Sequence, residues 1–215
     1  MSVKVKICGV NSPAAVEAAV GGGAAFVGFV FYPPSPRYLT IAGAAALARA
    51  VPSGVTRVGL FVEADDATLG QAIAEVGLEL LQLHGGETPA RVAAIKERFA
   101  IPVMKAIRIA RAGDVDAAKR FEGTADWLLF DALPPESMTT ALPGGNALSF
   151  DWRLIAGRRW EKPWMLSGGL TAKTLAEAVR TSGAAVVDVS SGVEDRPGHK
   201  DPARIAAFLA AAKRL

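Results

Sequence analysis

Residues 3–9 read Val-Lys-Val-Lys-Ile-Cys-Gly. Its hydrophobic residues alternate with two lysines and a cysteine, which predicts a β-strand with two different faces. Cys8, the only cysteine of the chain, shares a face with Lys6 and stands at the carboxyl end of the strand, beside Gly9. Ligands of parallel α/β proteins bind outside the carboxyl ends of strands, so Cys8 is a candidate reactive group.

The charge of Lys6 bears on the chemistry of this thiol. Lys6 precedes Cys8 by two positions, about 6.6 Å along an extended strand, and we expect it to favour the thiolate form. The alternative is a structural role, because a lone cysteine often packs as a small buried hydrophobic residue.

The composition predicts one globular domain over residues 1–215. Hydrophobic residues make up 51% of the chain and charged residues 21%, which excludes wholesale disorder. The formal net charge is only +3 and its cations are scattered, so no nucleic-acid partner is expected. A single cysteine fits a reducing compartment, and no apolar run reaches the ~20 residues that a membrane helix needs. We therefore expect a cytoplasmic protein without membrane contact.

The rest of the chain alternates apolar strand segments with helix-forming segments, as in a parallel sheet. The strands are predicted at residues 3–9, 25–31, 57–62, 80–84, 102–109, 126–132, 163–167 and 185–189. Helices are expected from caps at Ser12, Thr40, Thr88 and Asp201, and over residues 65–76, 114–121, 151–159 and 171–181.

Eight such units are the number that closes a single-domain (β/α)8 TIM barrel. An open doubly wound sheet is the structural alternative. That fold normally carries a glycine fingerprint after the first strand, and the sequence Gly9-Val10-Asn11 does not match it.

Two loops exceed what a barrel needs, and long loops at the carboxyl face usually serve a ligand. Residues 32–40 contain three prolines and one cation, Arg37, which suits a bidentate grip on a carboxylate. Residues 133–149 contain Gly144 and Gly145, which predict a flexible lid. The alternatives are a solvated surface arginine and a loop that serves only as a spacer.

Small residues follow the seventh and eighth predicted strands. Ser167-Gly168-Gly169 and Ser190-Ser191-Gly192 place backbone N–H groups where many barrels hold a phosphate. Tight turns alone would account for either loop, but their occurrence in adjacent units favours a phosphate site.

Asp131 ends the apolar sixth strand. Partial desolvation there is expected to raise its pKa toward that of a usable general acid. A capping or ion-paired aspartate is the alternative. The two histidines, His84 and His199, are too far apart in the sequence to indicate a metal site, so none is expected.

Taken together, the motifs at the strand ends resemble the phosphoribosylanthranilate isomerase family of tryptophan biosynthesis. The resemblance covers the whole chain and rests on Lys6-Ile7-Cys8-Gly9, Gly28-Phe29-Val30-Phe31, Ser35-Pro36-Arg37-Tyr38, Gln82-Leu83-His84-Gly85, Phe130-Asp131, Phe150-Asp151-Trp152, Ser167-Gly168-Gly169-Leu170 and Asp188-Val189-Ser190-Ser191-Gly192-Val193-Glu194. It implies an Amadori rearrangement of N-(5′-phosphoribosyl)anthranilate without metal or cofactor. In that reaction Asp131 would be the general acid and Cys8 the general base.

The resemblance also implies how the substrate is held. Arg37 would bind the anthranilate carboxylate, and Asp188 would contact the sugar or the linking nitrogen, with Gln82 and His84 as further substrate-binding residues. The phosphate would lie against Gly168, Gly169, Ser190, Ser191 and Gly192. One departure from the family pattern concerns the lid, where the usual final glycine of a Gly-Gly-Thr/Ser-Gly motif is Ala147.

Two other functions compete with this one. A related histidine-pathway isomerase would carry aspartates at the ends of the first and fifth strands, where Cys8 and Arg108 or Ile109 stand. A non-catalytic binder of a phosphorylated ligand would be favoured by the loss of Cys8 or Asp131, and both are present. The expected partner is a phosphorylated small molecule, and the protein is expected to be a monomer or a homodimer.

Overall fold

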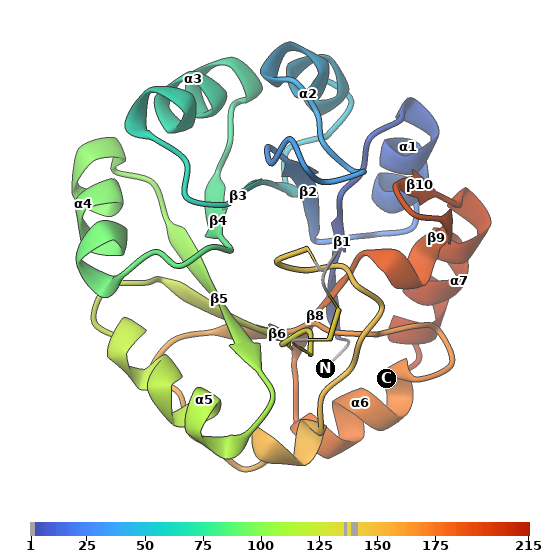
Figure 1. The fold of residues 1–215 in the computed structure, drawn as a ribbon. Coiled ribbons are helices and arrows are strands. Elements are labelled where there is room, and N and C mark those ends of the chain that lie inside the picture. Colours follow the sequence, from blue (N-terminus) through green and yellow to red (C-terminus); the bar gives the residue numbers. More distant parts are fainter. Residues whose placement is uncertain (1–2, 136, 139–141) are drawn as a thin grey trace.

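The computed structural model describes residues 3–135, 137–138 and 142–215, and within them eight parallel strands close into one barrel (Figure 1). The strands are β1 (Lys4–Cys8), β2 (Phe26–Val30), β3 (Thr56–Phe61), β4 (Leu80–Leu83), β5 (Val103–Ile109), β6 (Trp127–Ala132), β7 (Trp164–Leu166) and β8 (Val186–Val189). The pairing of β1 with β8 completes the ring. The predicted (β/α)8 barrel is therefore confirmed and the open sheet is wrong.

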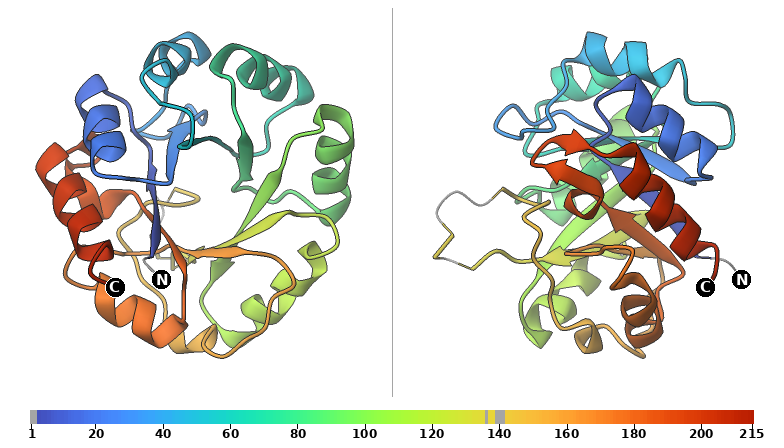
Figure 2. Two further views of the ribbon diagram at one scale, coloured as in Figure 1. Left: turned by 180° about the vertical axis from the view of Figure 1, so that it is seen from behind. Right: turned by 90° about the vertical axis from the view of Figure 1, so that its right-hand side faces the viewer.

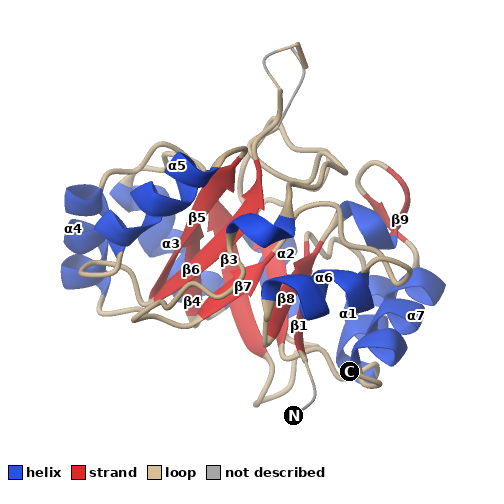
Figure 3. Cartoon of the chain, turned by 90° about the horizontal axis from the view of Figure 1, so that it is seen from below, coloured by secondary structure: helices blue, strands red, loops and turns tan. Residues whose placement is uncertain are grey.

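Helices surround the strands (Figure 1, Figure 3). They are α1 (Pro13–Gly21), α2 (Ile41–Ala48), α3 (Asp66–Val76), α4 (Pro89–Phe99), α5 (Ala112–Ala117), α6 (Leu175–Ser182) and α7 (Pro202–Ala212). The side chains of Ser12, Thr40, Thr88 and Asp201 each accept a backbone N–H in the first turn of the next helix, as predicted.

Three local predictions are wrong. Residues 151–159 form only a short 3-10 helix, η2 (Trp152–Leu154), and Gly157, three residues after its end, adopts a left-handed conformation with φ +68°. Helix α6 begins later than residue 171, since Thr171 and Thr174 form a side-chain-bonded turn before it. Residues 114–121 divide between α5 and the 3-10 helix η1 (Ala118–Phe121).

A small hairpin that the sequence did not predict follows β8. The 3-10 helix η3 (Ser191–Val193) leads into β9 (Glu194–Arg196), which pairs antiparallel with β10 (His199–Lys200). In Figure 1 this hairpin lies at the right-hand side, beside α1 and α7.

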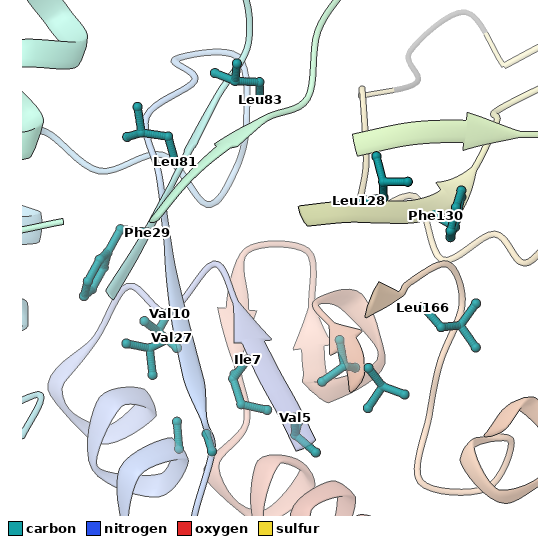
Figure 4. Close-up of a cluster of buried hydrophobic side chains, with 14 of the residues drawn as sticks. Val5, Ile7, Val10, Val27, Phe29, Leu81, Leu83, Leu128, Phe130 and Leu166 are labelled. Carbon is teal, nitrogen blue, oxygen red and sulfur yellow. The ribbon is translucent and has the colours of Figure 1, made fainter. Parts of the chain in front are cut away.

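Alternation along each strand divides the residues between two buried layers. One set of alternate strand residues belongs to the larger hydrophobic cluster, and Figure 4 shows Val5, Ile7, Val27, Phe29, Leu81, Leu83, Leu128, Phe130 and Leu166 from it. The other set faces the barrel axis and begins with an apolar cluster of Phe26, Val58, Leu80, Met104, Ala106, Leu129, Met165 and Val186. Further along several strands the same inward positions become polar, with Lys6, Gln82, Asp131 and Asp188 all buried. The polar residues are thereby confined to one end of the barrel.

That end carries the long segment after β6. Its described part projects from the carboxyl ends of the strands, on the side opposite the start of β1 and the chain's carboxyl terminus (Figure 2, Figure 3). Residues 136 and 139–141 of the predicted lid lie outside the described residues. In the described part of the chain, no helix is long and apolar enough to cross a membrane.

Candidate active site

All of the site residues predicted from the sequence line one pocket at the carboxyl ends of the strands. They are Cys8, Arg37, Gln82, His84, Asp131, Gly168, Gly169, Asp188, Ser190, Ser191 and Gly192. Residues 142–148 also line the pocket. Neighbouring strands of a parallel barrel end at the same face, so residues far apart in sequence meet here.

A buried ion pair adjoins the pocket through Asp188, which lines it. The Nζ of Lys6 lies 2.8 Å from Oδ1 of Asp188, and the two residues are register partners where β1 meets β8. The hydroxyl of Ser167 donates to the second carboxylate oxygen at 3.1 Å. Burial by itself would lower the pKa of Lys6, but Asp188 and Cys8 raise it above its ordinary value. Lys6 is therefore a charged part of the barrel interior.

Cys8 lies on the same strand face, as predicted, but its electrostatic environment differs from the expectation. Burial raises the pKa of the Cys8 thiol, and the opposing effect of Lys6 does not reverse that shift. The reason is visible in the ion pair, because most of the charge of Lys6 is balanced by Asp188. Gly28 makes room for the thiol, since a Cβ at that position would lie 3.2 Å from the sulfur.

Asp131 is buried at the end of β6 and belongs to a short polar chain. Its Oδ1 accepts the N–H of Ala132 at 2.9 Å, and its Oδ2 lies 3.4 Å from Nε2 of His84. The amide nitrogen of Gln82 lies 3.1 Å from Nδ1 of the same ring. An amide N–H can only donate, so Nδ1 accepts and the neutral ring carries its hydrogen on Nε2, facing Asp131. Gln82 thus orients the ring of His84, whose Nε2 lies beside Asp131 without forming a hydrogen bond to any described residue.

The predicted lid approaches Asp131 and His84 directly at Gly144. A Cβ at Gly144 would lie 2.7 Å from Oδ2 of Asp131 and 2.6 Å from Cε1 of His84. Glycine is therefore the residue that lets the lid close on the site. Ala147, the departure from the family's glycine pattern, has φ +57°, a conformation that costs most residues about 1 kcal/mol or more.

Arg37 is not a free surface cation. Its Nε and Nη2 donate to the two carboxylate oxygens of Glu194 at 2.7 and 2.8 Å, and Nη2 also donates to the carbonyl of Gly145 at 3.1 Å. The side chain is buried and lines the pocket. The arginine joins the loop after β2, the lid and the β9–β10 hairpin.

The loops after β7 and β8 are built around glycines. Gly168 and Gly169 have φ values of +90° and +66°, which only glycine adopts easily. A Cβ at Gly192 would overlap the carbonyl oxygen of Leu170, so no larger residue fits there. These contacts bring the two loops together at the pocket, where small residues leave backbone N–H groups accessible to an anion.

Sequence reasoning missed several charged residues that support the site. Glu194 belongs to a quoted motif but received no role, and Lys200 gave no periodic signal at all. A second buried pair, Lys105 and Glu87 at 2.9 Å, lies behind the loop that carries His84. The ammonium of Lys105 also donates to the carbonyl of Gly85, which fixes that loop. Among the residues that the structure describes, no group of three or more His, Cys, Asp or Glu side chains forms a candidate metal site.

Comparison with known proteins places this arrangement in a family. A sequence model described as N-(5′phosphoribosyl)anthranilate (PRA) isomerase matches residues 5–211. This chain belongs to the N-(5′-phosphoribosyl)anthranilate isomerase family. A relative of that name from Rhodospirillum centenum is 60% identical over 215 residues, covering 100% of both chains.

Solved structures of the family agree with the fold. The phosphoribosyl anthranilate isomerase of Thermotoga maritima superimposes with a TM-score of 0.88 at 36% identity, covering 99% of this chain and 100% of that one. Another isomerase structure, solved in complex with reduced 1-(o-carboxyphenylamino)-1-deoxyribulose 5-phosphate, has a TM-score of 0.84 at 34% identity, with the same coverage.

Proposed function

We propose that this chain catalyses the Amadori rearrangement of N-(5′-phosphoribosyl)anthranilate to 1-(2-carboxyphenylamino)-1-deoxyribulose 5-phosphate in tryptophan biosynthesis. The observation that carries the proposal is that Cys8 and Asp131 line one pocket, beside two glycine-rich loops, in a chain of this family. A family relative was solved with a reduced form of that product, which supports the same substrate class here.

Asp131 acts as the general acid. Its carboxyl group donates a proton to the furanose ring oxygen while the C1–O bond breaks, and the anilino nitrogen supplies the electron pair that forms the Schiff base. The positive nitrogen then acidifies the proton on C2. The N–H of Ala132 holds the carboxyl group in one orientation, which favours transfer to a fixed oxygen.

Cys8 acts as the general base. Its thiolate takes the proton from C2, and the electrons of that bond form an enolamine, which tautomerises to the ketone. A buried thiol with a raised pKa is less often ionised, but its thiolate is a stronger base once formed. Cys8 on β1 and Asp131 on β6 come from strands that are not neighbours, which suits reaction at two different atoms of the sugar.

The remaining pocket residues bind the substrate. Arg37, fixed by Glu194, holds the anthranilate carboxylate. The loops containing Gly168, Gly169, Ser190, Ser191 and Gly192 hold the phosphate. Asp188 lies beneath the sugar, where Lys6 and Ser167 keep it in place.

Loss of substrate fluorescence tests the proposal. N-(5′-phosphoribosyl)anthranilate is generated in situ, and the purified protein is added in catalytic amount. An isomerase removes the fluorescence with many turnovers per protein molecule. A change that stops at one equivalent of protein would mean a non-catalytic binder, and no change would overturn the proposal.

We also propose that the protein works in the cytoplasm as a monomer or a homodimer, with residues 1–215 as one domain. All of the proposed catalytic and binding residues come from a single chain, so one copy suffices for a complete site. Light scattering coupled to size exclusion would measure the mass, and a trimer or larger assembly would contradict this expectation.

A further inference from the structure

The β9–β10 hairpin carries two buried residues of opposite charge, which contact Arg37 and the loop after β8. Glu194 and Lys200 are register partners in the hairpin, both side chains are almost fully buried, and their charged atoms lie 2.5 Å apart. Lys200 has no role in the proposed function, and Glu194 enters it only as the partner of Arg37. A charged pair is costly to bury unless its hydrogen bonds are satisfied, so its contacts indicate what it is for.

Lys200 donates its other two hydrogen bonds to one residue of the loop after β8. Its Nζ donates to the carbonyl oxygen of Ser190 at 3.0 Å and to the hydroxyl oxygen of Ser190 at 3.1 Å. An ammonium has three hydrogens, and with Glu194 these contacts use all three.

The contact with the hydroxyl fixes the direction of its hydrogen. Because Oγ of Ser190 accepts from Lys200, its own O–H must point elsewhere, and the residue lines the pocket. The buried cation therefore turns Ser190 into a hydrogen-bond donor toward an anion.

Glu194 connects Lys200 to Arg37, the residue proposed to bind the substrate carboxylate. The same Oε1 that accepts from Lys200 accepts from Nε of Arg37, while Oε2 accepts from Nη2. The turn of the hairpin is packed against the Arg37 loop, since a Cβ at Gly198 would overlap the carbonyl oxygen of Pro36. One carboxylate thus holds the cation proposed for the substrate carboxylate and the cation behind the phosphate loop.

We propose that Lys200 is a positioning residue for the substrate phosphate, acting through the hydroxyl of Ser190, and that Glu194 anchors Lys200 and Arg37 at a fixed spacing. The proposal rests on the proposed function, which assigns the phosphate to the Ser190 loop and the carboxylate to Arg37. It adds to that function a residue pair that sets the geometry of both subsites.

Binding of the two halves of the substrate as separate probes tests this without requiring turnover. Inorganic phosphate and 2-aminobenzoate are titrated separately into the full chain, followed by NMR. The variants are K200M, S190A, the double variant S190A/K200M and E194Q, with H199Q as the control. His199 is the exposed neighbour of Lys200 on the same hairpin. Thermal melting shows which variants are folded.

K200M is expected to weaken phosphate binding about ten-fold or more, since a buried bond to a charged group is lost, and to change 2-aminobenzoate binding less than two-fold. In turnover it raises KM more than it lowers kcat. The double variant is expected to bind phosphate no more weakly than K200M alone, because the lysine acts through the serine. E194Q is expected to weaken both probes, and H199Q neither.

Several results would overturn the inference. Losses that multiply in the double variant would mean that Lys200 does not act through Ser190. Equal weakening of both probes by K200M would indicate a merely structural role, and unchanged binding in E194Q would remove the anchor. If K200M does not fold, the comparison of S190A with E194Q decides, because only E194Q should affect 2-aminobenzoate. Failure of the proposed function would show instead as wild-type protein that binds both probes but turns nothing over.

Discussion

Substituting Gly144 by alanine tests whether the closed lid completes the site. The added Cβ would stand 2.7 Å from Oδ2 of Asp131 and 2.6 Å from Cε1 of His84, whereas ordinary contacts begin at 3.4 Å. The lid or the two side chains must therefore move by about 0.7–0.8 Å. A misplacement of about 1 Å at a reacting group costs on the order of 100-fold in rate, so we expect kcat/KM to fall about 10- to 100-fold, or roughly 1.4–2.7 kcal/mol of transition-state stabilisation.

The assay is the loss of substrate fluorescence, with melting temperature measured in parallel. Gly144 lies in a loop segment, so the melting temperature of G144A should stay close to that of the wild type. Gly113, in α5, serves as the control, because no atom of the described residues lies within 4 Å of the position that an added methyl group would take. G113A should leave kcat/KM unchanged. A G144A variant with kcat/KM within two-fold of the wild type would show that close contact between the lid and Asp131 is not needed for turnover.

Three further predictions concern the interior and the lid. K6M leaves the carboxylate of Asp188 buried without its partner, so urea denaturation should show a loss of about 3–5 kcal/mol of stability; an unchanged midpoint would argue against the ion pair. A147G removes a left-handed alanine, and hydrogen exchange of residues 142–148 should slow by the equivalent of about 0.5–1 kcal/mol; faster exchange would contradict the assigned strain. Burial acts to raise the pKa of Glu87, but its lysine partner and backbone N–H groups hold the pKa below its ordinary value. Its stabilising contribution is therefore present above pH ~4.3 and is lost as the pH falls through the lowered pKa. E87Q should weaken the dependence of stability on pH in the acid range. A stability profile identical to that of the wild type would contradict the role of the Glu87 carboxylate.

The barrel and the composition of its site were predictable because they depend on local patterns. Alternation along β1 places Cys8 and Lys6 inward, and the same rule applies to Asp131 on β6 and Asp188 on β8. Since all parallel strands end at one face, strand-end residues meet whatever their separation in sequence. Capping residues such as Thr88 indicate where helices begin, because the capping hydrogen bond joins residues only three positions apart.

The failures at Glu194 and Lys6 share a physical cause, because the contacts that decide them join residues far apart in the sequence. The β9–β10 hairpin has strands of three and two residues, too short to show a period, and Glu194 meets Arg37 across 157 positions. The effect of Lys6 on the thiol was misjudged because its charge is balanced by Asp188, a partner set by how β1 and β8 close the ring. The helix expected over residues 151–159 ends at Leu154, before Gly157 with its left-handed conformation.

The proposed mechanism requires a thiolate from β1 and a carboxyl group from β6 to act on two different atoms of one sugar. A crystal structure of this protein with a reduced, phosphorylated product analogue would measure both distances at once. We expect Sγ of Cys8 within about 4 Å of C2 and Asp131 within hydrogen-bond distance, about 3.2 Å, of the former ring oxygen, with the phosphate at Ser190. An analogue bound with C2 remote from Cys8, or with its phosphate away from the loops after β7 and β8, would contradict the mechanism.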